Sequence, residues 1–571
     1  MKLVKTIKFL STTAMIGLMA TALGSCTNNN SSSQPSNTTA SSSSSSNTGT
    51  KPTSSGTGAS SSSSSTTPID DTGIFSTAEL ENDLVLDDEG KPSFDEPVTL
   101  KMWSIIGDPD QVVFAKLVQQ FNLEYEGMIQ IDVVYQGHFD YYTALDTTYQ
   151  TDFEASFPDI CFMHNERTVE YAYKGYLYPI DTLFGKTGVD IDTTQIYDNI
   201  GRVTMYKNRR FALPVDAHGF LTQFRQDIIK KNGLGFDDNT RFIPNNRAEY
   251  QTLLENLRTK ADAGELLVRN INRGEDHSWK VADKNSFYPE FTQSTDPDGL
   301  SALYANNGSL ANEAQDTITF GENEGFKTYL TDQVDRYNNK LMGESGTNTE
   351  MFGRGNTVMF SEGPWWVAQT YSSQWNNSEL KRAGQLGVSQ EDANDPVYSA
   401  PYIASRPTSW WTLDENQGTE HGTKWYGNGH AVSLTRHVTS LQKAAAALTF
   451  MKWYTQGSPI DADEADESYN LTTWCSSGHI PAWKNVYESK SYKTALEKNM
   501  TLRALGNPAD VLAMEGLEYE STIFKGIGDA VSAVQSALKE STGCTKERAL
   551  ERLQEVVDST QAALDLLKMD F

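Results

Sequence analysis

The sequence predicts an α/β fold in two domains, because strand and helix patterns alternate in its first third and because its folded part is long. Strand patterns cover residues 98–105, 129–135 and 159–163, and helical patterns separate them. Such alternation is typical of parallel strands joined by crossover helices. About 500 residues from Pro68 to Phe571 exceed what one hydrophobic core holds, so we expect two domains.

The helices have their own signals. Asp108-Pro109-Asp110 predicts a helix start, with a carboxylate at the N-cap and proline at the first helical position. A second helical pattern covers residues 139–153. The apolar stripe of the first helix is Val113, Leu117 and Phe121, with Phe114 and Val118 beside them. A closing helix after Thr545 is predicted by Leu550, Leu553, Val557, Leu564 and Leu567 at helical spacing.

The order of these elements also predicts where a ligand binds. In parallel sheets the ligand crevice lies beyond the carboxyl ends of the strands. The loops that follow the three strands cover residues 104–108, 136–142 and 163–167. We therefore expect the binding residues in these loops.

The N-terminus carries the pattern of a secretory signal, because Lys2, Lys5 and Lys8 precede an apolar stretch and small residues. It ends in Leu23-Gly24-Ser25-Cys26, which resembles a bacterial lipobox and implies lipid attachment at Cys26 and removal of residues 1–25. An ordinary secretory signal with an incidental cysteine is the alternative. The apolar run is shorter than the roughly 20 residues of a membrane-spanning helix.

The next segment cannot fold by itself. Residues 28–67 are almost entirely Ser, Thr, Asn, Gly and Pro, a composition that buries no core and stays disordered. Residues 26–67 are thus predicted to be a lipidated cysteine and a flexible linker. Residues 68–97 are predicted to be an acidic lead-in to the folded part.

Composition excludes several classes of function. The net charge is −28, and removal of the three signal lysines makes it more negative, which excludes nucleic acid as a partner. Besides Cys26 there are only Cys161, Cys475 and Cys544, which predicts buried free thiols rather than a disulfide framework. No HExxH, CxxC or closely spaced histidine pair is present, so we expect neither a metal site nor a cofactor.

Several sequence blocks occur in the order found in one protein family. The first are KMW with Gly107-Asp108, LVQQFNLEYEG, VVYQGHFDYY, FPDI and YAYKGYLYPIDTL, and the later ones are RRFALPVDAHG, FRQDIIKKNGL, MFGRGNTVMFSEGPWWV, GHAVSL, AAAALTFMKWY and GHIPAWKNVYES. Together they resemble the family-one extracellular solute-binding proteins, the sugar-capturing components of ABC importers, which include maltodextrin-binding proteins.

The resemblance implies a two-lobed, periplasmic-binding-protein-like fold of the class II type. Each lobe is expected to be a mostly parallel sheet flanked by helices, with the ligand cleft at the hinge. The expected partition is 98–213 plus 430–480 for the N-terminal lobe and 217–425 plus 484–571 for the C-terminal lobe. The implied partners are a carbohydrate and an ABC permease.

A sugar-binding site needs flat aromatic surfaces and paired hydrogen-bonding groups. Trp365 and Trp366 follow Gly363-Pro364, and the resemblance implies that Trp365 stacks on sugar. Packing of either indole into the core is the alternative. The segment PDICFMHNER matches a sugar-binding stretch of the family without gaps, which implies that Glu166 and Arg167 bind hydroxyls. A simple ion pair is the alternative for these two, and Met163 replaces a stacking tryptophan of the family.

Further candidates lie in other loops and connections. The resemblance assigns Gly107-Asp108 to the sugar site, although Asp108 also suits a helix cap. Asp216 and His218 follow Leu213-Pro214, where the family has a cleft-lining acid. Tyr142 follows the second strand, and Trp410 and Trp411 lie in a Pro- and Gly-rich connection that we expect over the cleft or hinge.

These features predict a lipid-anchored, monomeric binding protein at the outer face of the cell membrane, which captures a carbohydrate by lobe closure. No GxSxG, GxxxxGK[ST] or zinc signature supports an enzyme. A secreted glycosidase needs only two carboxylates and stays an alternative. A surface adhesin is a third possibility, although no internal repeat beyond the serine runs supports it.

Overall fold

The computed structural model describes residues 72–569, except 138–139, 292–295, 344–347, 365–394, 407, 420–421, 423, 460–467, 514 and 541–542. Within these residues, no helix is both long and apolar enough to cross a membrane. The predictions for residues 1–71, including the signal and Cys26, lie outside the described residues.

The first of two five-stranded sheets has the strand order β2-β1-β3-β16-β6. Its strands are β1 (Val98–Ser104), β2 (Ile129–Tyr135), β3 (Ile160–His164), β6 (Ala212–Pro214) and β16 (His430–Leu434). β1 pairs in parallel with β2 and β3, as the sequence pattern predicts. β16 inserts between β3 and β6 and is antiparallel to both.

The second sheet has the order β12-β11-β13-β8-β14. Its strands are β8 (Leu221–Phe224), β11 (Glu290–Phe291), β12 (Met342–Gly343), β13 (Met359–Glu362) and β14 (Ile403–Ser405). β11 is parallel to β12 and β13, whereas β8 is antiparallel to β13 and β14. Each sheet defines one lobe of the two-lobed α/β fold.

The expectation of mostly parallel sheets is confirmed for the described strands, since four of the five strands in each sheet run in one direction and one strand, β16 or β8, runs opposite to them. The physical reason is the direction of entry. β16 and β8 follow crossover segments from the other lobe, so they start at the edge where β3 and β13 end. A strand that starts at that edge must run opposite to its neighbours.

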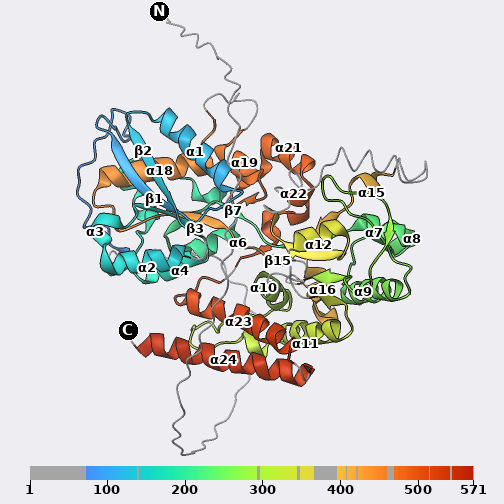
Figure 1. The fold of residues 1–571 in the computed structure, drawn as a ribbon. Helices are drawn as coiled ribbons and strands as arrows, with labels where there is room; N and C mark the ends of the chain where they lie inside the picture. The colour runs from blue at the N-terminus through green and yellow to red at the C-terminus, as the bar shows by residue number, and fades with distance from the viewer. Residues whose placement is uncertain are drawn as a thin grey trace, which may run out of the picture. The chain divides into compact units, whose positions relative to one another are not determined.

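Within the described residues, the first lobe has a core that its sheet and eleven helices share. In Figure 1, α1 and α18 pack on this sheet, and α4 packs against β3. The helices are α1 (Gln111–Glu124), α2 (Tyr141–Thr151), α3 (Phe153–Ser156), α4 (Arg167–Tyr173), α5 (Phe184–Thr187), α6 (Asp198–Gly201), α18 (Leu441–Gln456), α19 (Asn470–Cys475), α20 (Lys484–Glu488), α21 (Lys490–Lys498) and α22 (Met500–Leu505). The predicted stripe of α1 is buried through Phe114, Leu117, Val118 and Phe121.

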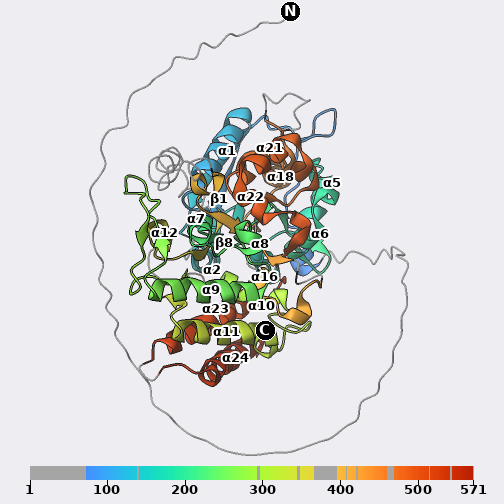
Figure 2. The same ribbon diagram turned by 90° about the vertical axis from the view of Figure 1, so that its right-hand side faces the viewer.

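The second lobe has a separate core. Its helices are α7 (Gln226–Lys231), α8 (Phe236–Asn239), α9 (Arg247–Asp262), α10 (Asp296–Ala305), α11 (Glu324–Asn338), α12 (Asn348–Arg354), α15 (Pro396–Ser399), α16 (Thr408–Trp411), α23 (Glu520–Leu538) and α24 (Lys546–Met569). Helices α11, α23 and α24 pack side by side in both views (Figures 1 and 2). The predicted closing helix is α24, and its Leu553 and Leu564 are buried.

Two of the predicted domain boundaries do not agree with the lobe in which the side chains are packed. Val486, Tyr487 and Tyr492 belong to the first core, although the sequence assigns residues 484–571 to the second lobe. Helix α22 lies between the lobes, because it also contacts β8 and β14. The acidic lead-in packs on the first lobe, where Leu80 and Phe94 are buried.

Short paired strands connect the lobes. β7 (Asp216–Ala217) pairs in antiparallel fashion with β17 (Ile480–Pro481), and His218 bridges to Asn428. The other short strands are β4 (Met205–Tyr206), β5 (Arg209–Arg210), β9 (Leu267–Val268), β10 (Lys280–Val281), β15 (Trp425–Tyr426) and β18 (Val511–Leu512). The three crossovers are thus hydrogen-bonded to one another.

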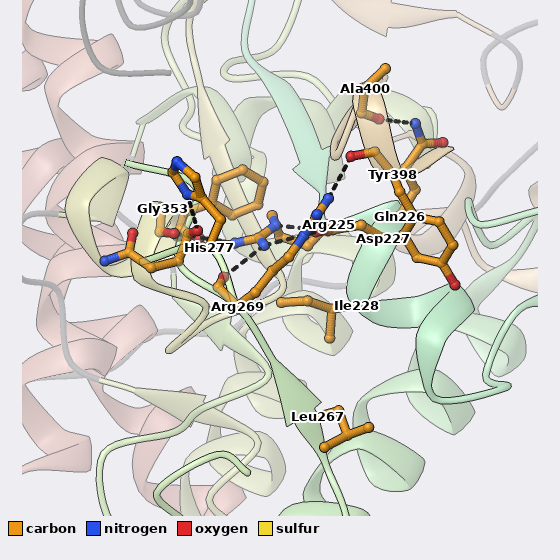
Figure 3. Close-up of polar contacts among 12 residues, drawn as sticks. Arg225, Gln226, Asp227, Ile228, Leu267, Arg269, His277, Gly353, Tyr398 and Ala400 are labelled. Carbon is orange, nitrogen blue, oxygen red and sulfur yellow. Dashed lines mark hydrogen bonds and ion pairs between the residues drawn. The ribbon is translucent and has the colours of Figure 1, made fainter. Parts of the chain in front are cut away.

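A buried ion-pair network holds the loops of the second lobe. Asp227 accepts from Arg225 Nε at 2.9 Å and from Arg269 Nε at 2.7 Å. The guanidiniums also donate to the carbonyl oxygens of Phe352 and Tyr398 at 2.6 Å (Figure 3). Burial opposes ionisation of Asp227, but the two guanidiniums outweigh it and hold the pKa of this carboxyl below its usual value. The network therefore joins four separate segments around one carboxylate.

Candidate ligand-binding site

A cleft of about 680 Å³ lies between the two lobes. Its walls come from the loops after β1 and β3, from the crossovers and from α10 and α23. The lining residues are Ile105, Ile106, Gly107, Asp108, Asp110, Tyr142, His164, Glu166, Arg167, His218, Gly219, Phe220, Pro297, Tyr426, Asn428, His430, His479 and Phe524. Two of the three loops that the sequence singles out therefore contribute most of the first-lobe wall.

Asp108 and Asp110 differ from the predicted helix start. α1 begins at Gln111 with Asp110 at the N-cap position, so Asp108 is not the cap and Pro109 is not the first helical residue. Residues 108–110 instead form a turn that leads into α1, and Gln111 N donates to Gly107 O at 2.9 Å. Asp108 is exposed at the cleft. Asp110 is buried there, and burial raises the pKa of its carboxyl to about 7.

Glu166 and Arg167 both line the cleft, at the carboxyl end of β3. Glu166 is buried, and this loss of solvent raises its pKa to about 7 against the opposing effects of Arg167, Asn428 and His218. Arg167 lies 2.7 Å from Glu520 through Nε and 3.3 Å from Glu170 through Nη1. The guanidinium thus contacts two acids of the protein itself.

These contacts belong to a polar seam between α4 and the start of α23, formed by Arg167, Glu170, Tyr173, Tyr519, Glu520 and Ser521. Glu170 accepts from Ser521 N at 2.9 Å and from Ser521 Oγ at 2.8 Å. The hydroxyls of Tyr173 and Tyr519 lie 2.9 Å apart. Burial raises the pKa of Glu520 to about 8, although Arg167 opposes the shift. Because α4 and α23 belong to different lobes, this seam fastens one lobe to the other beside the cleft.

Tyr142 lies against the same arginine. The Arg167 guanidinium carbon is 4.4 Å from the centre of the Tyr142 ring, an arrangement that favours cation–π attraction. The Tyr142 hydroxyl accepts from His164 N at 3.1 Å. Tyr142 therefore positions Arg167 and the end of β3 as well as lining the cleft.

Asp216 is fully buried beneath the cleft rather than lining it. Its carboxylate accepts from His218 Nδ1 at 3.1 Å, His430 Nδ1 at 2.9 Å, His430 N at 3.1 Å and the indole of Trp474. Burial opposes its ionisation, but His430 and His479 outweigh this and hold the pKa well below its usual value. The carboxylate fixes His218 and His430, which do line the cleft.

Trp410 and Trp411 are wrongly predicted. Both belong to the second core, and Trp410 stacks on Tyr250 with ring centres 5.3 Å apart. The reason is that α16 packs between α9 and α10, which carries both indoles away from the cleft. Trp365 and Trp366 lie outside the described residues.

Several cleft residues escaped the sequence analysis: Asp110, Phe220, Tyr426, Asn428, His430, His479 and Phe524. His430 and His479 follow Gly429 and Gly478 in two of the blocks that carry the family resemblance, which was a usable signal. No sequence pattern around Glu520 indicated that it lies beside the cleft, because only the tertiary fold brings α23 to Arg167.

The model of the bacterial extracellular solute-binding protein family matches residues 116–499. The chain belongs to this family. A solute-binding protein of this kind works outside the cytoplasm, and it is a binding protein rather than an enzyme. No curated protein sequence matches the chain significantly.

Solved structures share the fold of this solute-binding protein. The GacH receptor of Streptomyces glaucescens, described with acarbose, has a TM-score of 0.56 at 15% identity, over 82% of this chain and 99% of its own. The sugar-binding protein MalE from Xanthomonas citri has a TM-score of 0.57 at 14% identity, over 83% and 100%. UgpB from Mycobacterium tuberculosis, in complex with glycerophosphocholine, has a TM-score of 0.57 at 12% identity, over 82% and 99%.

Proposed function

We propose that this protein captures a neutral carbohydrate, of oligosaccharide size, in its cleft and delivers it to the permease of an ABC importer. The observation that carries the proposal is the mixed lining of the cleft. Tyr142, Phe220, Tyr426 and Phe524 offer aromatic surface, and Asp108, Asp110, Glu166 and Asn428 offer hydrogen-bonding groups. Sugar rings need apolar surface for their C–H faces and planar polar groups for their hydroxyls.

The charges of the lining favour a neutral ligand over an anionic one. Among the lining residues that the structure describes, Asp108, Asp110 and Glu166 bring carboxyl groups to the cleft, and Arg167, the one arginine of this set, contacts Glu520. A phosphodiester such as the one bound by UgpB would meet acidic groups there. Carboxylates accept well from sugar hydroxyls. GacH is described with acarbose and MalE as a sugar-binding protein, which agrees with this choice.

Trp365 stays a proposed stacking residue. Glu362, the last residue of β13, pairs with Leu221, which directly follows the cleft-lining Phe220. Trp365 is three residues further on, and three residues span at most about 11 Å. This short connection to β13 supports the proposal that Trp365 takes part in the site.

Capture would work by a shift between conformations. A ligand that touches both lobes stabilises the arrangement in which the lobes are close. The closed form would then dock on the permease. We expect the polar seam around Arg167 and Glu520 to break and re-form as the lobes move.

Ligand-dependent compaction tests this function. A thermal-shift screen against a panel of neutral oligosaccharides identifies a ligand, since a ligand at 100 times its Kd stabilises by about 2.7 kcal/mol. Small-angle scattering at saturation should then show a smaller radius of gyration than without ligand, and the recovered sugar should be chemically unchanged. A hydrolysed sugar, or stabilisation by glycerophosphocholine alone, would contradict the proposal.

We also propose that Cys26 carries a lipid that anchors the mature protein to the outer face of the membrane, with residues 26–67 as a linker. The support is the lipobox-like sequence and the serine-rich composition. Expressed with its signal in a bacterium, the Cys26→Ala protein should move from the membrane fraction to the soluble fraction. A Ser25→Ala variant, which keeps a small residue before the cysteine, should stay with the membrane. Equal membrane retention of the Cys26→Ala protein would refute the anchor.

A further inference from the structure

We propose that Asp216, His218, His430 and His479 bind one divalent transition-metal ion, zinc or a metal with similar ligand preference, at the floor of the cleft. All four residues are buried, and each offers a ligand atom within 4.8 Å of the other three. Four of the eight histidines of the chain, these three and His164, gather around this place. The proposal concerns the protein alone and does not depend on which solute it captures.

The four ligand atoms lie only slightly farther apart than they would around a bound metal ion. Four atoms within 4.8 Å of one another fit inside a sphere of radius about 2.9 Å, whereas zinc–ligand bonds are about 2.0–2.2 Å long. Each ligand atom therefore has to move inward by at most about 0.9 Å to reach a common ion. The ring centres of His218 and His430 are 4.6 Å apart, and those of His218 and His479 are 5.1 Å apart.

The donor set selects the class of metal. Three imidazoles and one carboxylate suit zinc, cobalt, nickel and copper, whereas calcium and magnesium prefer oxygen ligands. In the structure, the Asp216 oxygens face Nδ1 of His218 and Nδ1 of His430 at 3.1 and 2.9 Å. A bound ion takes the place of the protons in these two contacts. Metal binding is then accompanied by proton release.

The surroundings hold the donors in place. The indole of Trp474 donates to Asp216, and its ring stacks on His479 with centres 4.7 Å apart and an interplanar angle of 15°. Asp110 Oδ2 lies 3.6 Å from His479 Nε2. A Cβ atom at Gly429 would come within 2.1 Å of the Asp216 carbonyl oxygen, so glycine is required where β16 approaches β7. Such second-layer contacts orient metal ligands.

The four donors come from all three crossovers. Asp216 and His218 belong to the first, His430 to the second and His479 to the third. An ion at this place would tie the crossovers together. Since His218, His430 and His479 also line the cleft, the ion would lie within reach of oxygen atoms of a captured solute.

Direct titration tests the proposal. The purified full-length protein is treated with a chelator, dialysed and titrated with Zn²⁺ by calorimetry and with Co²⁺ by visible absorption. We expect one equivalent of Zn²⁺ with micromolar or tighter affinity, the intense absorption of four-coordinate cobalt, and no comparable binding of Mg²⁺ or Ca²⁺. His430→Ala and His479→Ala should each weaken Zn²⁺ binding at least about tenfold.

His437→Ala is the matched control. His437 is partly buried in the first lobe, and its Nδ1 lies 2.8 Å from Asp159, outside the cluster. Its substitution should leave Zn²⁺ affinity unchanged. If the cluster variants fail to fold, the wild-type titration still decides. Absence of a bound equivalent in the wild type, cobalt without a four-coordinate spectrum, or unchanged affinity in folded cluster variants would each overturn the proposal.

Discussion

The Asp227→Ala protein is expected to lose about 3–5 kcal/mol of its free energy of unfolding, because the change leaves Arg225 and Arg269 buried without their shared counter-ion. Both guanidiniums point at the Asp227 carboxylate (Figure 3) and have almost no contact with solvent. The measurement is urea unfolding followed by tryptophan fluorescence and circular dichroism. The unfolding midpoint should shift to lower urea, since the second lobe loses the counter-ion of its network.

The matched control is Asp529→Ala. Asp529 pairs with Lys525 on the exposed face of α23, with side chains 49% and 70% exposed. Exposed pairs contribute less than about 1 kcal/mol, so this variant should unfold almost as the wild type does. A loss for Asp227→Ala no greater than that of Asp529→Ala would mean that the network contributes specificity rather than stability.

The second large effect is expected at Trp365, if this indole stacks on the captured sugar. Removal of a buried aromatic platform costs about 2 kcal/mol or more, which corresponds to roughly 30-fold in affinity. The measurement is calorimetric titration of the sugar found in the screen into the wild type and the Trp365→Ala protein. Melting temperatures of both proteins are measured first, so that a folding defect is not taken for a binding defect.

Two tryptophan variants serve as controls for Trp365. Trp279 is half-buried in the second lobe beside Arg269 and does not line the cleft, so Trp279→Ala should bind the sugar normally. Trp366→Ala tells which of the neighbouring indoles faces the ligand. If Trp366→Ala loses affinity and Trp365→Ala does not, the assignment of the two is reversed. If neither loses affinity, the stacking surface lies elsewhere.

Short sequence patterns correctly predicted those helices and strands whose boundaries depend on neighbouring residues in the chain. The alternation after Val98 gave β1, β2 and β3 within one residue of their observed ends, because each is a short apolar run bounded by polar loops. The leucine spacing gave α24 in the same way. The antiparallel β8 and β16 were missed, since strand direction depends on which lobe the chain comes from.

The residues of the candidate site could be predicted from the sequence only where they follow a strand. Asp108, Tyr142, Glu166 and Arg167 lie in the cleft because strand ends meet at one edge of a sheet. Trp410 and Trp411 are of the residue type that sugar sites use. The sequence of an aromatic pair in a loop region does not tell, however, whether the side chains pack into the core or face a ligand. The partners of Arg167 and of Asp216 lie hundreds of residues away, so no local pattern contains them.

The position of β16 has a consequence for how the chain reaches its native state. β16 is hydrogen-bonded between β3 and β6, yet roughly 270 residues separate it from β3 along the chain. While the protein is being made from its N-terminus, residues 98–214 can form a partial sheet but lack the strand that joins its two parts. Pairings of such long range are slow to form. The first lobe should therefore stay incompletely folded until residue 434 has been synthesised, although it is encoded first.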